Sequence, residues 1–407
     1  MTNFASISRT EQIVISLRFK SLLVDKPHPK AKRELVSTVI SSSRSPEDYT
    51  AVVNEFALLL ITGQRVLIWN WLTGKCHARI DTTMPGGITE ASFLQRTAFM
   101  AFRQVENTPK LEVYSFSAKE PTSEEPPPPI LRAIYLLPSL QNGVEMVMQC
   151  RCDPPPFQYS HLVQPDMSSF PIDPPCYMRR PFQIQETSRT LVLAINVRTD
   201  TGQHQDLVIF APLQAFISTN LDPEAPKREP QVVPASEWMR DSHVFGNIPL
   251  SDQWIYGTRF ATVITDSPGQ RNFCMFDFNP AIAKYLKHKH GRNRSQNEYP
   301  EPEAGVKQSV EDQDIIEWTE GNAVIILGLS GTEFTDEMIF KEPLQGGAPV
   351  LISISEEGID VLPNETLRVL IDDERVLLAR VSRSASVLCA VRCAGLSNHS
   401  PQSSVQR

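Results

Sequence analysis

The stretch Phe56–Ile80, which reads FALLLITGQRVLIWNWLTGKCHARI, decides the fold class of this chain. Phe56–Ile61 is an unbroken apolar run of strand length. Thr62-Gly63-Gln64 supplies turn residues, and Arg65–Leu72 is a second run rich in β-branched and aromatic residues. The stretch therefore predicts a β-hairpin.

A third strand is expected directly after this hairpin. Thr73-Gly74 are turn residues, and Lys75–Ile80 can return beside the second strand. Because side chains alternate along a strand, we expect Cys76, Ala78 and Ile80 to share one face. Three short antiparallel strands in sequence form most of one blade of a β-propeller.

The second strand of the hairpin ends in two tryptophans and a turn. The string Val66–Gly74 resembles the end of the third strand of a WD40 blade, where an apolar triplet leads to an aromatic residue, a polar residue, Trp and a Ser/Thr-Gly turn. We take Trp69, Trp71, Thr73 and Gly74 as the structural signature of the blade. The two tryptophans are expected on opposite faces, with Trp69 packed in the core and the other at an edge.

Similar groups of apolar ribbons recur along the chain, the second about 45 residues after the first, which is the spacing of four-stranded blades. Trp238 and His243–Gly246 are expected to open the fourth group, and an early strand within Glu11–Val24 could pair with the last strand and close a ring. The prediction is an all-β propeller over residues 11–395, with disordered ends at 1–10 and 396–407. It has about six or seven antiparallel blades and long loop insertions, with units near residues 50–80, 88–137, 143–217, 238–280, 313–340 and 348–392.

Composition narrows the class of protein. The 407 residues are 41% hydrophobic and 21% charged, which are globular values. Proline is abundant, with 33 residues against 18 glycines, and this suits short strands joined by long connections. The net charge of -8 gives no general attraction for nucleic acid or for anionic membranes, so neither is an expected partner.

The expected location is cytoplasmic or nuclear. Seven scattered cysteines are too few for a disulfide framework and their number is odd, which fits a reducing compartment. The N-terminus lacks the pattern of a secretory signal, and no apolar run reaches the roughly 18 residues of a membrane helix.

Catalytic, cofactor-binding and metal-binding residues are not expected in this sequence. His288 and His290 lie two residues apart among lysines, and Cys150 and Cys152 have neither the spacer nor the second pair of ligands that a zinc site uses. No Gly-rich phosphate loop and no nucleophile elbow is present. The chain is therefore predicted not to be an enzyme.

Candidate partner contacts come from two short segments. Lys284–Arg294 is the best local candidate for contact with an acidic partner, through Lys287 and Arg292, for a nuclear import signal or for RNA contact, although a solvated loop is the simpler interpretation. Trp254 and Tyr256 are expected as surface aromatics that would mark a contact site. The expected partner is a protein or peptide; the sequence does not determine the oligomeric state.

The hairpin FALLLITGQRVLIWNWLTG, followed by ASFLQRTAFMAF and LEVYSF, resembles the WD40-like propeller regions of fungal, mostly mushroom-type, proteins that carry an F-box ahead of the propeller. No F-box helix bundle is visible in this chain. The resemblance implies the substrate-recognition propeller of a ubiquitin ligase complex, and hence a non-catalytic interaction scaffold. The alternatives are a propeller enzyme that uses the central channel and a partial or degenerate gene product.

Overall fold

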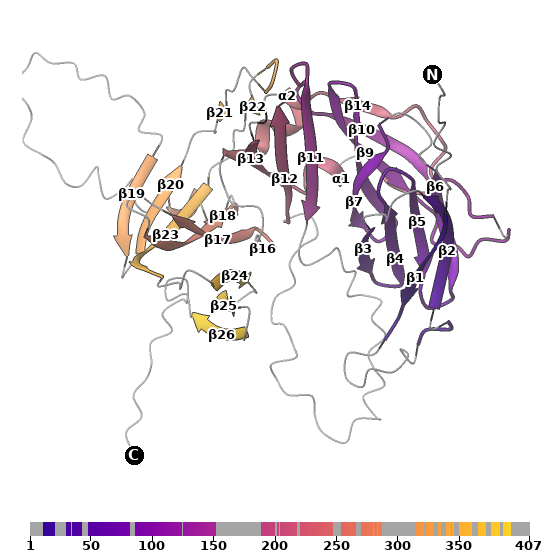
Figure 1. The fold of residues 1–407 in the computed structure, drawn as a ribbon. Coiled ribbons are helices and arrows are strands. Elements are labelled where there is room, and N and C mark those ends of the chain that lie inside the picture. The colour runs from indigo at the N-terminus through magenta and orange to yellow at the C-terminus, as the bar shows by residue number, and fades with distance from the viewer. Residues whose placement is uncertain are drawn as a thin grey trace, which may run out of the picture.

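The computed structural model shows an all-β chain whose strands form a series of antiparallel sheets (Figure 1). The two expected disordered ends, 1–10 and 396–407, lie outside the residues that the structure describes. These residues are 11–20, 30–33, 35–42, 48–81, 86–123, 125–151, 189–199, 202, 204–217, 220–246, 254–265, 270–279, 281–282, 284–286, 315–320, 323–328, 333–334, 339–342, 344–345, 350–359, 365–371, 376–382 and 386–391.

The first large sheet is a four-stranded antiparallel meander in the order β3-β4-β5-β6. Three of its strands confirm the prediction from the sequence, and β3 adds a fourth at the edge. The segment DYTAVV of β3 is half polar and short, so it gave no clear strand signal. The strands are β3 (Asp48–Val53), β4 (Phe56–Ile61), β5 (Arg65–Asn70) and β6 (Lys75–Asp81).

The second and third large sheets repeat this meander. In the second, β7, β8, β9 and β10 follow one another, and β14 joins the outer edge parallel to β10. The third has the order β11-β12-β13-β15. The strands are β7 (Ile88–Gln95), β8 (Ala98–Val105), β9 (Thr108–Ser115), β10 (Ile130–Leu136), β14 (Gln231–Val233), β11 (Val144–Arg151), β12 (Thr190–Thr199), β13 (His204–Pro212) and β15 (His243–Gly246).

The fourth large sheet has six strands in the order β16-β17-β18-β23-β20-β19. It joins strands from three of the expected units because β23 pairs with both β18 and β20. Beyond it lie the three-stranded sheet β24-β25-β26 and the small pair β21-β22. The strands are β16 (Trp254–Tyr256), β17 (Arg259–Thr265), β18 (Arg271–Asp277), β19 (Ile315–Glu320), β20 (Ala323–Gly328), β21 (Glu333–Phe334), β22 (Leu344–Gln345), β23 (Val350–Gly358), β24 (Glu365–Ile371), β25 (Val376–Ser382) and β26 (Ser386–Val391).

The four large sheets pack face to face in chain order, with β7 of the second sheet against β3 of the first and β11 of the third (Figure 1). Each buried face meets the next sheet because a ribbon with apolar residues on both sides cannot cover itself. Three apolar clusters make these contacts. They contain Leu58, Ile68, Phe99 and Ala101 between the first and second sheets, Met100, Phe102, Met148, Leu193 and Ile209 between the second and third, and Val208, Phe210, Phe260 and Phe276 between the third and fourth.

The outer face of the first sheet is covered by the hairpin of β1 (Glu11–Arg18) and β2 (Leu35–Ser42). Ile15 and Val36 of this hairpin pack on Leu59 and Trp69. The early strand was expected to pair with the last one, but β1 pairs with β2 along its whole length. Within the described residues neither strand pairs with β26. The covered face explains why β4 is an unbroken apolar run, since both of its sides are buried.

The expectation that Cys76, Ala78 and Ile80 share one face is wrong. Ala78 and Ile80 pack toward the second sheet, whereas Cys76 packs with the cluster under the β1-β2 hairpin. The register of β5 and β6 shifts between Ile68 and Trp69, so that Cys76 and Ala78 oppose consecutive residues. An extra residue at this bulge reverses the alternation of side chains.

The tryptophans of the first sheet do not point to opposite faces as expected. Trp69 is buried at 6% exposure beneath the β1-β2 hairpin, which confirms its role in the core. The Trp71 ring stacks on Phe19 at 5.8 Å, and Phe19 packs against the cluster that contains Trp69. Residues two apart on a strand point the same way, which explains why both rings lie on this side.

The third sheet and its connections also differ from the prediction. Trp238 belongs to the short helix α2 (Ala235–Trp238), and its Nε1 donates to Leu136 O of β10 at 2.8 Å. β15 pairs with β13, so His243–Gly246 completes the third sheet rather than opening a fourth unit. Two other helical turns, α1 (Gln214–Ile217) and the 3-10 turn Met239–Asp241, lie in the same connection.

Candidate functional site: a polar network at the Trp71 end of the sheets

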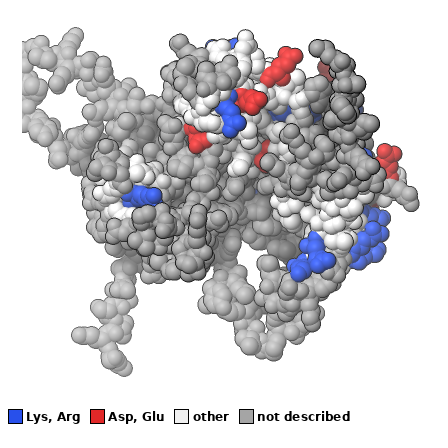
Figure 2. Space-filling view, viewed as in Figure 1, with Lys and Arg blue, Asp and Glu red and all other residues white. Residues whose placement is uncertain are grey.

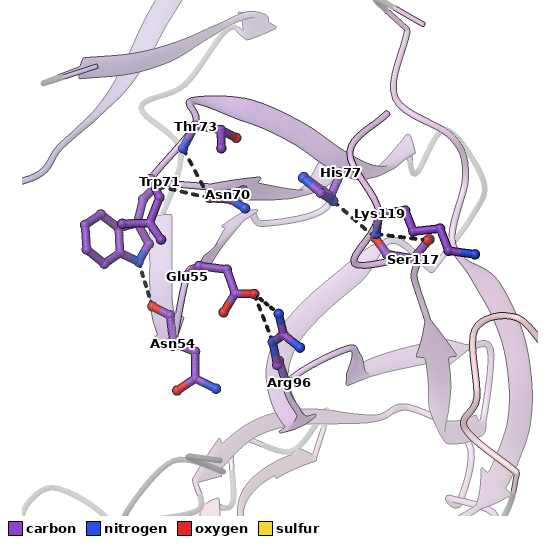
Figure 3. A network of polar contacts seen from close by, with 10 residues as sticks. Asn54, Glu55, Asn70, Trp71, Thr73, His77, Arg96, Ser117 and Lys119 are labelled. Atoms are coloured by element: carbon purple, nitrogen blue, oxygen red, sulfur yellow. Dashed lines mark hydrogen bonds and ion pairs between the residues drawn. The ribbon is translucent and has the colours of Figure 1, made fainter. Parts of the chain in front are cut away.

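Turns from the first, second and fourth sheets lie at the same end of the stacked strands. Alternate turns of a meander fall on one end, which places Asn54-Glu55, Trp71–Gly74 and Arg96-Thr97 together. The Gly257-Thr258 turn of the fourth sheet joins them, since Thr190 at the start of β12 donates to Gly257 O at 2.8 Å. We call this region the Trp71 end, and Figure 3 shows its polar contacts in the first two sheets.

Glu55 and Arg96 tie the first sheet to the second. The Glu55 carboxylate accepts a hydrogen bond from Arg96 Nε at 2.9 Å and another from Arg96 Nη2 (Figure 3). The guanidinium carbon also lies 5.9 Å from the centre of the buried Phe56 ring. Asn54, which precedes Glu55, has a φ of 51°, a left-handed conformation that asparagine tolerates better than most residues. The turn thus aims Glu55 at the neighbouring sheet.

Asn70 and Trp71 organise the turn between β5 and β6. The Asn70 side-chain oxygen accepts hydrogen bonds from the amides of Leu72 at 3.0 Å and Thr73 at 3.2 Å. Trp71 Nε1 donates to Asn54 O at 2.7 Å, so the two turns of the first sheet hold one another (Figure 3). Gly74 closes the turn with a φ of 72°, which favours glycine. The signature residues Trp71, Thr73 and Gly74 therefore lie in one connected turn.

His77 connects β6 to the loop after β9. Its ring is 1% exposed, its Nδ1 lies 3.1 Å from Ser117 O, and its edge meets Phe56 with ring centres 5.1 Å apart. Nε2 of this histidine is buried and has no hydrogen-bond partner among the residues that the structure describes. The position of His77 was not predicted, because nothing in its local sequence indicates a second sheet beside it.

The segment 220–230 crosses from the third sheet to the second and fastens this loop. Ser117 Oγ donates to Glu224 at 3.1 Å, and Lys119 Nζ pairs with the same carboxylate at 2.7 Å. Arg132 of β10 donates to Asp222 O at 2.7 Å. We call residues 220–230 the strap. The strap, the loop after β9 and the turns of the first sheet form one continuous polar surface.

Two exposed ion pairs, Lys75–Glu120 and Lys119–Glu224, lie on this surface. Glu224 accepts hydrogen bonds from Lys119 and Ser117, and Glu120 accepts one from Lys75, which lowers the pKa of each carboxyl. All four charged side chains are well exposed, so these pairs add little stability and leave charge available to a partner. On the face shown in Figure 2, basic and acidic side chains of the described residues form small separate groups of both signs.

Three ionisable side chains of the sheets, two buried and one half-buried, are held in single protonation states. Burial raises the pKa of the Cys76 thiol to about 11 and that of Cys274 to about 12, so both stay protonated at neutral pH. Burial opposes ionisation of Glu112, but hydrogen bonds from Lys110 and Tyr114 and the charge of Arg103 leave its pKa below the ordinary value. In the described part of the chain, no group of three His, Cys, Asp or Glu side chains could hold a metal ion.

The other predicted contact residues are not brought into this network. Tyr256 is half-buried at the end of β16, directly before Gly257, and Trp254 begins the same strand. Lys287 and Arg292 lie outside the described residues. Asn54, Glu55, Arg96 and Ser117 were not predicted, since turn residues show no local sign of which neighbouring sheet they will contact.

The described fold and network define an all-β protein of stacked antiparallel sheets with a polar turn surface. Comparison with protein-family models and with curated protein sequences finds no match to the chain. Among the described residues, every helix is too short or too polar to pass through a bilayer.

Proposed function

We propose that this chain is a non-catalytic scaffold that binds a protein or peptide at the Trp71 end of its sheets, in the cytoplasm or nucleus. The single observation that carries the proposal is that turns and loops from successive sheets are cross-linked there into one polar surface. Rigid elements that present loops in this way are suited to recognition.

The finer architecture that we propose is a WD40-like propeller. The sheets follow one another face to face, and β7 lies between the first strands of its two neighbours, which supports radial stacking. The β24-β25-β26 sheet contacts β16 and β17 with its first strand. The outward side of the β1-β2 hairpin carries Val14 at 63% and Val39 at 52% exposure, directly opposite one another. Closure of a ring would cover this pair.

The resemblance to fungal F-box-associated propellers suggests the kind of assembly involved. In such an assembly the propeller would recognise a substrate protein for a ubiquitin ligase, and an adaptor of the Skp1 type would be recovered with it. The surface that binds the substrate protein and the surface that binds the adaptor would both consist of side chains, without a bound cofactor.

Affinity purification of the tagged full chain from cells tests the proposal. Lys119→Glu reverses an exposed charge at the Trp71 end, where Lys119 is 76% exposed. Arg198→Glu is the matched control, because Arg198 is exposed near the opposite end of β12 and changes the charge by the same amount. We expect a repeatable partner that is lost with Lys119→Glu and kept with Arg198→Glu. Recovery of no repeatable partner, or equal loss with both variants, would contradict the proposal.

A further inference from the structure

Arg189 is the largest fully buried side chain among the described residues, at 2% exposure. Its Nε and Nη1 atoms are buried and have no hydrogen-bond partner in the described part of the chain. An arginine stays charged at physiological pH and has five N–H donors, so an uncompensated guanidinium in this position is strongly unfavourable. The fold holds a buried positive charge that requires an acceptor.

The backbone fixes Arg189 at the junction of the third and fourth sheets. Its carbonyl accepts a hydrogen bond from Leu213 N at 2.8 Å, and the next residue, Thr190, donates to Gly257 O at 2.8 Å. Gly257 follows Tyr256, the aromatic residue expected at a contact site, and precedes Thr258, which donates to Asp277 at 3.1 Å. Hydrogen bonds of the backbone at Arg189 and Thr190 therefore hold Arg189 between Leu213 and Gly257 at the Trp71 end.

Other arginines of the sheets have hydrogen-bond acceptors for their guanidinium groups. Arg96 bonds Glu55, Arg103 bonds Glu112, and Arg65 bonds Asp81, each across a strand or a sheet boundary. Arg132 has Ser115 and carbonyl oxygens of the strap as acceptors. Arg189 is more deeply buried than these four side chains, and its Nε and Nη1 atoms lack the acceptor within the described residues that each of the four has.

We propose that Arg189 binds one carboxylate group at the junction of the third and fourth sheets. A carboxylate accepts several N–H bonds in the plane of a guanidinium, and its single negative charge balances the single positive charge. A phosphate dianion would leave one uncompensated negative charge in a buried place, next to the Gly257-Thr258 turn that already contacts the Asp277 carboxylate. The single positive charge of the guanidinium therefore favours a carboxylate over a phosphate dianion.

The carboxylate can come from a small free acid or from an acidic side chain of a bound peptide. Both sources present the same group to Arg189, and either would reach it through local opening of the turns around Gly257. A free acid would bind whether or not the chain is an interaction scaffold, so this inference stands apart from the proposed function.

Thermal unfolding of the full chain in sodium acetate, against sodium chloride at equal ionic strength and pH 7, tests the site. At about 100 mM acetate, a hundredfold excess over a millimolar Kd, we expect Tm to rise by about 4 °C relative to chloride. Arg189→Gln should abolish the rise. Arg198→Gln changes an exposed arginine of β12, the strand that begins directly after Arg189, and should keep the rise.

A second arm separates the two sources of the carboxylate. Acetyl-glutamate amide carries a peptide-borne carboxylate, and acetyl-glutamine amide is its neutral counterpart. A larger rise with the glutamate compound than with acetate assigns the site to a peptide side chain, and the reverse assigns it to a free acid. Sodium phosphate at equal ionic strength should raise Tm less than either carboxylate, and a stronger effect of phosphate would overturn the choice of ligand.

If Arg189→Gln does not fold, line broadening of ¹³C-acetate by the folded wild-type chain provides the second measurement, with Arg189→Lys as the charge-preserving variant. Broadening that is saturable and weaker with Arg189→Lys supports the site. The absence of any acetate effect on the wild-type chain, or an equal effect in Arg189→Gln, overturns it.

Discussion

Replacing Phe56 with alanine should strongly destabilise the packing of the first sheet on the second. The Phe56 ring is 0% exposed and meets Phe116 with ring centres 5.0 Å apart, His77 at 5.1 Å and the Arg96 guanidinium at 5.9 Å. Truncation of a buried phenylalanine costs roughly 3–5 kcal/mol, and edge-to-face ring pairs add roughly 0.5–1.5 kcal/mol beyond area. We expect a loss of about 4 kcal/mol.

This loss is large compared with the roughly 5–15 kcal/mol that stabilises a typical folded protein. Urea unfolding followed by circular dichroism and by tryptophan fluorescence measures it, since both Trp69 and Trp71 lie in the first sheet or its turn. The two signals should shift together if the sheets unfold as a unit.

Two variants serve as controls for Phe56→Ala. Phe56→Leu keeps most of the apolar volume and should lose less than half as much. Val52→Ala changes a residue of the neighbouring strand β3 that is 49% exposed, and it should cost under about 1 kcal/mol. A loss below about 1 kcal/mol for Phe56→Ala, or an equal loss for Val52→Ala, would refute the packing described between the two sheets.

Three further predictions concern ionisable groups and turns. The lowered pKa of Glu112 stabilises the fold at pH values above the ordinary pKa of 4.5, and this stabilisation is lost as the pH falls through the lowered pKa. Glu112→Gln should therefore reduce the dependence of the unfolding free energy on pH in that acidic range. An unchanged pH dependence would contradict this prediction. Gly74→Ala should destabilise the fold more than Gly63→Ala. Both glycines have φ near 70°, where an alanine side chain costs about 1 kcal/mol, but only a Cβ at position 74 would lie 2.8 Å from the Arg33 side chain. Equal unfolding free energies of the two variants would exclude that contact. Cys76 and Cys274, whose pKa values are raised, should resist alkylation by iodoacetamide at pH 8 until urea unfolds the chain, and rapid native labelling located by mass spectrometry would contradict their burial.

Strand positions in the first half of the chain were largely predictable. The runs at 56–61, 65–72 and 75–80 became β4, β5 and β6 because turn residues and apolar runs are local properties. Met146, Met148 and Cys150 occupy alternate positions and are all buried in β11, with Glu145 and Gln149 exposed next to them. Local periodicity was sufficient for these elements since each needs only its own residues to define it.

Pairings and faces were less predictable. The bulge that turns Cys76 away from Ala78 depends on the register with β5, and the union of β18, β23 and β20 in one sheet depends on strands more than 20 residues apart. The parallel addition of β14 to β10 brings residues about 100 positions apart into one sheet. The pattern of apolar residues shows that both faces of a strand are buried, but it does not show which other strands or sheets cover those faces.

In the candidate site, local features were predictable from the sequence and long-range contacts were not. The turn residues Trp71, Thr73 and Gly74 were recognised from their local sequence, whereas the Glu55–Arg96 pair and the buried Arg189 had no sequence signal. Arginine is mostly found at the protein surface, and only the tertiary structure shows that this one is buried.

By itself, the sequence determined that this chain is all-β, where most of its early strands run and where its tight turns fall, because backbone conformation responds to neighbouring residues. The tertiary structure alone decided which strands share a sheet, which turns meet at the Trp71 end and which charges become buried. Those outcomes depend on contacts between distant segments, whose free energy is set by burial of whole faces rather than by any local pattern.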